Sequence, residues 1–306
     1  PEQDALRRDF TVNALFYNIA DFSLIDYVNG LADIRDRLLR SIGDPLRRYV
    51  EDPVRMIRAV RFAAALKLEM ETRTYDAIAA CRDHLALAAP ARLYEEVLKL
   101  FACGQAARVY ALLKETGLLA VLFPDFAQWL AANPPGGDAM TAAAFAHLDA
   151  CKRDGRSLSP ATQFALIFGA YHEAEADRLL AGQDAAGHDT AVRLDAVEQH
   201  AARLRARLMM PRGVSLDMAH IMALQPRFAD RRPANVNRLI RRPSFEDALE
   251  YRAFKAHASG TGMDEVFWWS TCDIPESAPL PLASRGGSQR RRRRPRPQQA
   301  TAAHAS

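Results

Sequence analysis

Apolar side chains recur every three or four residues through most of the chain, a spacing typical of amphipathic helices. Strand-like sequence is limited to the start: 23–30 predicts a short strand running into a turn at Asn29-Gly30, and 9–19 fits either a helix or a strand. The spacing therefore predicts a mostly helical chain, with helices over 31–43, 53–67, 72–87, 92–103, 105–122, 141–153, 160–181 and 189–208.

The composition is that of a folded protein outside membranes. Of the 306 residues, 49% are hydrophobic and 25% are charged. No apolar run approaches the roughly 18 residues that a membrane helix needs. The four cysteines are widely scattered and form no CxxC pair, so we expect reduced thiols in a cytoplasmic protein.

Positive charge is concentrated at the end of the chain. The net charge is +4, but residues 283–306 hold seven arginines and no acid or lysine, so the rest of the chain carries −3. From Ser277 onward the sequence is rich in Pro, Ser, Gly and Arg, which predicts a disordered basic tail. The segment "AANPPGGDAM" (131–140) predicts a linker.

The stretch "YVEDPVRMIRAVRFAAAL" (49–66) places three arginines on one helix. Asp52-Pro53 is a strong helix start, and steps of three residues keep Arg55, Arg58 and Arg61 within one broad sector. This pattern fits a solvated arginine face. It also fits a binding site in which Asp52 accepts and Arg55 donates hydrogen bonds, matching a base edge such as that of adenine.

Four motifs decide between these interpretations: "RRDFTVNAL" (7–15), "DYVNGLADIRDRLLRSIGDP" (26–45), "EDPVRMIRAVRFAA" (51–64) and "PARLYEEVLKL" (90–100). In this order they resemble the class II nucleotidyltransferases, the superfamily of bacterial poly(A) polymerases and tRNA CCA-adding enzymes. The resemblance implies a mostly α fold that begins with the C-terminal remnant of an α/β nucleotidyltransferase head. The expected domains are the head remnant, a helical neck that binds the nucleotide base and RNA, a helical arginine-rich body and the disordered basic tail, over 1–45, 46–130, 131–276 and 277–306.

The resemblance also implies which residues contact the nucleotide. Asp52 and Arg55 would select the base, and the "RRD" element would contact ribose and phosphates. The complete implied nucleotide-binding set is Arg7, Arg8, Asp9, Asn13, Asp52, Arg55 and Arg58. In the fourth motif, Arg92 and Glu95 are expected to form a buried or half-buried pair that fixes a turn between helices.

Phosphoryl transfer in this superfamily uses Mg²⁺ held by paired carboxylates. No Asp-x-Asp occurs in the 306 residues, and Asp33 and Asp36 are interpreted as helix surface. We therefore assign no catalytic or metal residue to this chain and expect the carboxylates upstream of Pro1. The chain does not start with Met, so we expect a fragment that is inactive alone.

The function implied is template-independent addition of AMP from ATP to RNA 3′ ends, promoting RNA decay. RNA, ATP and decay proteins are the expected partners. Aromatic residues Phe228, Phe245, Tyr251 and Phe254 are interpreted as core. The arginines expected to bind RNA are Arg238, Arg241, Arg242, Arg290, Arg291, Arg292, Arg293 and Arg294.

Three other functions fit parts of the sequence. A tRNA CCA-adding enzyme shares the four motifs. A phosphohydrolase domain is disfavoured because His188-Asp189 sits in a Gly/Ala-rich stretch and because the spacing of His147, His172 and His200 is not that of metal ligands. A non-catalytic RNA-binding helical protein would explain the arginines, but not Asp52 and Arg55 together with "RRDFTVNAL".

Overall fold

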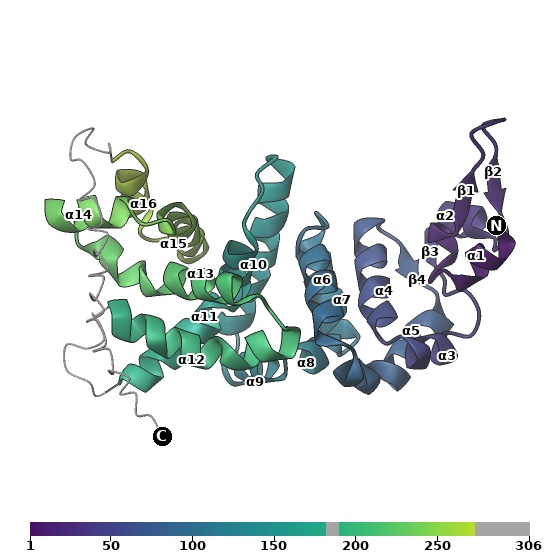
Figure 1. Cartoon of the computed structure of the whole chain (residues 1–306), viewed down its shortest axis with the longest axis horizontal. Helices are drawn as coiled ribbons and strands as arrows, with labels where there is room; N and C mark the ends of the chain where they lie inside the picture. Colours follow the sequence, from purple (N-terminus) through teal and green to yellow (C-terminus); the bar gives the residue numbers. More distant parts are fainter. Residues whose placement is uncertain (182–189, 273–306) are drawn as a thin grey trace, which may run out of the picture. The chain divides into compact units, whose positions relative to one another are not determined.

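The computed structural model describes residues 1–181 and 190–272, which Figure 1 colours along the chain. They belong to one compact unit, Pro1–Cys272. Within these ranges strands occur only before residue 71, and helices supply the remaining regular structure, none of them long and apolar enough to cross a membrane. The predicted mostly helical fold with a small mixed segment at its start is confirmed. The predicted tail, 277–306, lies outside the described residues.

The mixed segment opens with α1 (Glu2–Arg7) and a 3-10 turn, η1 (Thr11–Asn13). Strand β1 (Leu15–Tyr17) pairs antiparallel with β2 (Leu24–Asp26). The Asp26 carboxylate accepts the backbone N–H groups that follow β2, including that of Gly30 at 3.0 Å. A Cβ on Gly30 would lie 2.3 Å from the Thr11 carbonyl oxygen, so only glycine fits there. The predicted strand and turn are confirmed.

The helix predicted over 31–43 is shorter than expected. Helix α2 (Gly30–Arg35) ends before Arg37, whose φ is +53°, and β3 (Leu38–Leu39) then pairs parallel with β4 (Glu69–Met70). The prediction that Asp33 lies on the helix surface is wrong.

Asp33 is 4% exposed. Its carboxylate accepts hydrogen bonds from Thr11 Oγ1 at 2.6 Å and Arg40 Nε at 3.2 Å. A buried carboxylate is tolerated when it is paired in this way.

The candidate site is carried by α4 (Val54–Ala65), α5 (Thr72–Cys81) with the 3-10 segment η2 (Arg82–Leu87), and α6 (Pro90–Phe101), which follow the helices predicted over 53–67, 72–87 and 92–103. Helix α3 (Pro45–Glu51), which precedes them, was not predicted. On α4, the apolar residues Val54, Ile57 and Val60 are buried, which leaves its arginines on the other sector. Helix α4 starts one residue later than predicted and has no side-chain capping hydrogen bond.

The linker predicted over 131–140 is wrong. Only Asn133–Pro135 separates α9 (Pro124–Ala132) from α10 (Gly136–Arg153). Helix α10 packs against α7 (Ala106–Glu115), which is followed by α8 (Leu118–Leu122). The rings of Tyr110 and Phe145 stack with centroids 4.9 Å apart. Pro and Gly here mark the start of a packed helix.

Helix α11 lies among α10, α12, α13 and α15. Its Gly169 lets it approach the Tyr251 ring, since a Cβ there would lie 2.2 Å from the hydroxyl oxygen. The largest apolar core extends from Phe10 to Phe254, and a second cluster extends from Leu224 to Trp269. The domain boundaries predicted within 1–272 stay a prediction. The remaining elements are α11 (Pro160–Leu180), α12 (Thr190–Leu208), α13 (Arg212–Ala223), η4 (Gln225–Ala229), α14 (Pro233–Ile240), α15 (Phe245–Ser259) and α16 (Met263–Ser270).

The aromatic residues predicted to be core, Phe228, Phe245, Tyr251 and Phe254, are each at most 5% exposed. That prediction is confirmed.

Candidate functional site

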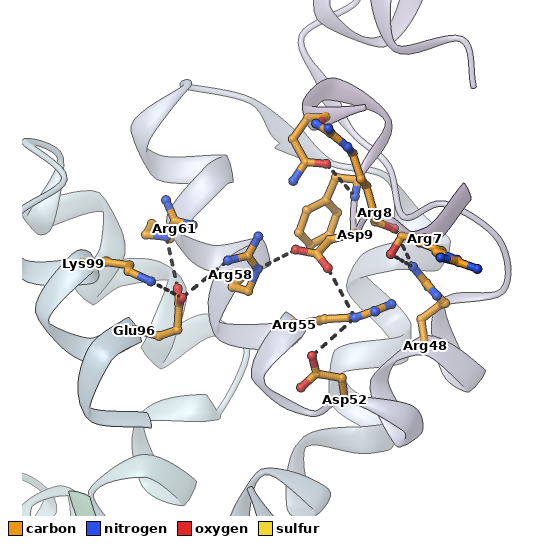
Figure 2. A network of polar contacts seen from close by, with 12 residues as sticks. Arg7, Arg8, Asp9, Arg48, Asp52, Arg55, Arg58, Arg61, Glu96 and Lys99 are labelled. Atoms are coloured by element: carbon orange, nitrogen blue, oxygen red, sulfur yellow. Dashed lines mark hydrogen bonds and ion pairs between the residues drawn. The ribbon is translucent and has the colours of Figure 1, made fainter. Parts of the chain in front are cut away.

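Arg55 on α4 lies between two carboxylates that come from different motifs (Figure 2). Its Nε is 3.3 Å from Asp9 Oδ1 and 3.6 Å from Asp52 Oδ2. The Arg55 side chain is only 15% exposed, and its Nη1 is buried without a hydrogen-bond partner. The structure therefore brings Asp9, Asp52 and Arg55 together, although 43 residues separate the two aspartates in the sequence.

Arg58 and Arg61 continue the contacts along α4 to a buried glutamate on α6. Arg58 Nε is 2.5 Å from Asp9 Oδ2, and its Nη1 is 3.4 Å from Glu96 Oε1. Arg61 Nε lies 3.4 Å from Glu96 Oε2, and Lys99 Nζ lies 2.8 Å from Glu96 Oε1. Figure 2 shows these alternating charges as a continuous series.

The Asp52 carboxylate is also held by α6. Arg92 donates from Nη1 and Nη2 to the two carboxylate oxygens, each at 2.9 Å. Burial raises the pKa of Asp52, but hydrogen bonds from Arg92 and the positive charges of Arg92 and Arg55 outweigh burial and hold the pKa below its usual value. We define the charge chain as Asp9, Asp52, Glu96, Arg55, Arg58, Arg61, Arg92 and Lys99.

The predicted buried pair of Arg92 and Glu95 is wrong. Glu95 is exposed, the Arg92 side chain is 56% exposed, and Arg92 contacts Asp52. The buried acid is Glu96, which lies three residues after the buried Leu93 on the inner side of α6, whereas Glu95 points outward. An acid at an inward position of an amphipathic helix was the sequence signal for Glu96, and it was missed.

Glu96 is held ionised by the three cations around it. Burial raises its pKa, but the hydrogen bond from Lys99 and the charges of Arg58 and Arg61 outweigh this effect and lower the pKa. Because these cations are drawn toward one carboxylate, Glu96 fixes the direction of two of the three arginines on α4.

The "RRD" element is positioned by backbone contacts. Arg48 Nη2 donates to the carbonyl oxygens of Arg7 and Arg8 at 3.0 and 2.5 Å. Arg8 donates to the Asn13 carbonyl at 2.8 Å, and Asn13 Oδ1 accepts the Phe10 N–H at 3.3 Å. The Arg7 side chain is exposed. Sequence reasoning did not single out Arg48, which carries no motif signature.

The arginines predicted to bind RNA fall into two groups. Arg238 on α14 and Arg241 and Arg242 just after it are exposed. Arg290, Arg291, Arg292, Arg293 and Arg294 lie outside the described residues, as does His188-Asp189.

Two of the histidines from the disfavoured phosphohydrolase interpretation lie close together. His172 Nδ1 and His200 Nδ1 are 2.7 Å apart. Burial, together with the neighbouring His200, lowers the pKa of His172 to about 3. His172 is therefore a neutral group of the protein interior.

Three family models match parts of the chain. Residues 1–40 match the poly A polymerase head domain, residues 67–130 match the probable RNA and SrmB-binding site of polymerase A, and residues 187–300 match the polymerase A arginine-rich C-terminus. The first of the four motifs lies within 1–40 and the fourth lies within 67–130, whereas the motif at 51–64 lies between these two matches.

Two kinds of enzyme are found among the relatives. Poly(A) polymerase I of Escherichia coli O157:H7 is 33% identical over 96% of this chain and 65% of its own length, and that of Haemophilus influenzae is 35% identical over 88% and 59%. The CCA-adding enzyme of Bacillus licheniformis is 41% identical over 38% of this chain and 29% of its own length. The chain thus spans about 65% or less of each of these relatives.

Solved structures of CCA-adding enzymes share the fold. The Thermotoga maritima CCA-adding enzyme complexed with tRNA aligns with a TM-score of 0.60 and 19% identity, over 90% of this chain and 62% of that one. A CCA-adding enzyme in complex with ATP aligns with a TM-score of 0.58 and 18% identity, over 88% and 60%. With these family models and relatives, the chain belongs to the poly(A) polymerase/tRNA nucleotidyltransferase family.

Proposed function

We propose that this chain is the base-selecting and RNA-binding part of a poly(A) polymerase, which adds AMP from ATP to RNA 3′ ends without a template. The observation that carries the proposal is the contact of Arg55 with both Asp9 and Asp52, because it joins two family motifs in one site. The similarity to bacterial poly(A) polymerase I over 96% of the chain favours adenylate addition. RNA decay, a cytoplasmic location and decay-protein partners belong to the same proposal.

In this proposal Asp52 and Arg55 recognise the adenine edge. The amino group of adenine donates to Asp52, and a ring nitrogen accepts from Arg55. A carboxylate has about four acceptor sites, and Arg92 uses two of those on Asp52. Arg92 is more than half exposed, so it has room to turn away. The unpartnered Nη1 of Arg55 supplies unused donor capacity.

The remaining implied contacts are orienting ones. Arg58 is tied to Asp9 and Glu96, so in this proposal it fixes the direction of Asp9. Arg7 and Arg8 directly precede Asp9 in the sequence. In this proposal their side chains bind the phosphates of the nucleotide. Asn13 accepts the Phe10 N–H and so stabilises the turn after the "RRD" element. In this proposal the turn orients the "RRD" backbone toward the ribose.

The described residues do not fit the Mg²⁺ that the family resemblance implies. The Asp9 and Asp52 carboxylates are engaged by arginines. The only group of three potential metal ligands among residues 1–181 and 190–272 contains a thiol and an imidazole, whereas Mg²⁺ prefers oxygen ligands. We therefore derive no step of the reaction through a metal on this chain.

Exposed arginines supply the proposed RNA contact. Arg238, Arg241 and Arg242 are exposed near the end of α14, and the family model that matches 187–300 is arginine-rich. Backbone phosphates dominate single-strand affinity, and such contacts carry little sequence preference. This suits an enzyme that accepts many RNA ends.

A CCA-adding enzyme is the second candidate function. It is favoured by the 41% identity to the Bacillus licheniformis enzyme over 117 residues. A CCA-adding site must accept CTP as well as ATP, so nucleotide preference separates the two. A non-catalytic RNA-binding protein would bind neither nucleotide selectively.

The test is competition among ATP, CTP, GTP and UTP for binding to the chain. We expect ATP to bind most tightly. Arg55→Ala and Asp52→Ala should each reduce that preference by about tenfold or more, because a hydrogen bond to a charged group is worth roughly 1.5–3 kcal/mol.

Arg47→Ala is the matched control, since the Arg47 side chain is 80% exposed and pairs with Glu51, outside the charge chain. An unchanged preference in both site variants would refute base selection by Asp52 and Arg55. Equal affinity for ATP and CTP in the wild-type chain would favour the CCA-adding alternative.

A further inference from the structure

Three metal-ligating side chains meet between α10 and α15. His147 and Cys151 lie one turn apart on α10, and Glu250 extends from α15. One ligand atom from each lies within 4.8 Å of the others. His147 Nε2 is 2.7 Å and Cys151 Sγ is 3.8 Å from Glu250 Oε1. Imidazole, thiolate and carboxylate together are typical zinc ligands.

We propose that His147, Cys151 and Glu250 bind a zinc-class divalent cation, with water as the fourth ligand. Zn²⁺ takes tetrahedral ligands at about 2.0–2.3 Å, which places ligand atoms roughly 3–4 Å apart. The separation of 2.7 Å lies just below that range and the separation of 3.8 Å lies within it, so small side-chain rotations suffice. The four-residue spacing on α10 places His147 and Cys151 on the same helix face.

Arg156 occupies the place of the cation in the present structure. Its Nη1 is 2.8 Å from Glu250 Oε2, and its Nη2 is 2.9 Å from Cys151 Sγ. The Arg156 side chain is 44% exposed, so it can turn into solvent. On metal binding the Cys151 thiol releases its proton to solvent, and the Arg156 guanidinium leaves both ligands.

An adjacent cavity provides room for the fourth ligand. It measures about 180 Å³, and its lining includes Cys151, Arg156 and Gln163. Gln163 Nε2 donates to the Leu158 carbonyl at 3.0 Å, but its Oε1 is buried without a partner. A buried acceptor normally finds a donor, and a metal-bound water is such a donor. This unpartnered oxygen is an observation independent of the three ligands.

The experiment uses the full 306-residue chain, freed of metal with a chelator and titrated with Co²⁺ and then Zn²⁺. We expect one Co²⁺ per chain, with a thiolate-to-cobalt absorption band that Zn²⁺ abolishes. Cys151→Ser should remove the band, and His147→Gln should weaken Co²⁺ binding more than about tenfold. Cys103→Ser, which lies outside the cluster, should leave both unchanged. Circular dichroism checks that each variant folds.

Arg156→Gln distinguishes a metal site from a simple ion-pair cluster. Removing the competing guanidinium should tighten Zn²⁺ binding by about tenfold. Failure of the wild-type chain and of Arg156→Gln to bind one equivalent of Co²⁺ or Zn²⁺ would overturn the proposal. A cobalt band that survives in Cys151→Ser would also overturn it. Neither outcome bears on nucleotide selection by Asp52 and Arg55.

Discussion

Replacing Glu96 with Gln tests whether one buried carboxylate organises the arginine side of α4. Gln keeps the size of the side chain but removes its charge. Glu96 is 5% exposed and contacts Arg58, Arg61 and Lys99 at 3.4, 3.4 and 2.8 Å. After the substitution three cations would remain close together around a neutral amide.

The size of the effect follows from the exposure of the partners. Breaking a fully buried ion pair costs about 3–5 kcal/mol. Here Arg58 and Arg61 are 26% and 18% exposed, and Lys99 is 49% exposed, so the Lys99 contact is worth about 1 kcal/mol or less. We expect Glu96→Gln to lower the free energy of unfolding by about 2–3 kcal/mol and the melting temperature by roughly 5–10 °C.

Thermal unfolding monitored by circular dichroism measures this effect, with Glu95→Gln as the control. Glu95 is the adjacent residue on the same helix, but it is exposed. Equal melting temperatures for Glu96→Gln and Glu95→Gln would refute the reasoning.

The pH dependence gives a second measurement. The pKa of Glu96 lies below its ordinary value of 4.5 in the folded protein, so folding favours the ionised form. Its contribution to stability is complete above the unfolded pKa and is lost as the pH falls through the folded pKa. The stability gap between wild type and Glu96→Gln should therefore be constant above about pH 6 and shrink below about pH 4.5. A gap that does not change with pH would contradict a charge-based role.

Three further predictions concern other parts of the chain. Gly30→Ala should destabilise the protein by about 1–3 kcal/mol, because its Cβ would lie 2.3 Å from a backbone oxygen; an unchanged melting temperature would contradict this. Because the fold holds the pKa of His172 near 3, stability should fall as the pH drops from about 6.5 toward 3, by up to about 1.4 kcal/mol per pH unit. His172→Leu should flatten that slope while the exposed control His257→Leu does not, and equal slopes would refute the assignment. Deleting 282–306 should flatten the plot of log RNA affinity against log salt by about 2–4 units, and equal slopes would mean that the tail does not touch RNA.

Local features were predictable from the sequence. The helices over 53–67 and 92–103 were predicted because apolar spacing reports burial directly, and α4 and α6 confirm them. The proximity of Asp52 and Arg55 was also predictable, since Asp52 lies just before α4 and only three residues from Arg55 in its first turn.

Contacts between distant segments were not predictable in this way. Asp33 can be buried because Thr11 and Arg40 donate hydrogen bonds to its carboxylate. The residue spacing within its own helix does not predict these contacts. Arg92 reaches Asp52 from 40 residues away. The Pro-Pro-Gly-Gly run near 135 has a composition typical of linkers, and only the packing of α10 on α7 shows that a helix starts there. The four-residue spacing of His147 and Cys151 was visible in the sequence, but Glu250 was needed to complete the group.

The charge chain contains three carboxylates and five cations, and this excess of positive charge determines how an anion would bind there. A polyphosphate that binds here would compete with existing ion pairs, because each arginine of the charge chain already contacts a carboxylate. Binding would be an exchange in which phosphate oxygens replace carboxylate oxygens, and the displaced carboxylates would turn to water. The measured affinity would then be the difference between two sets of ion pairs. A modest affinity at this site would therefore be compatible with many close contacts.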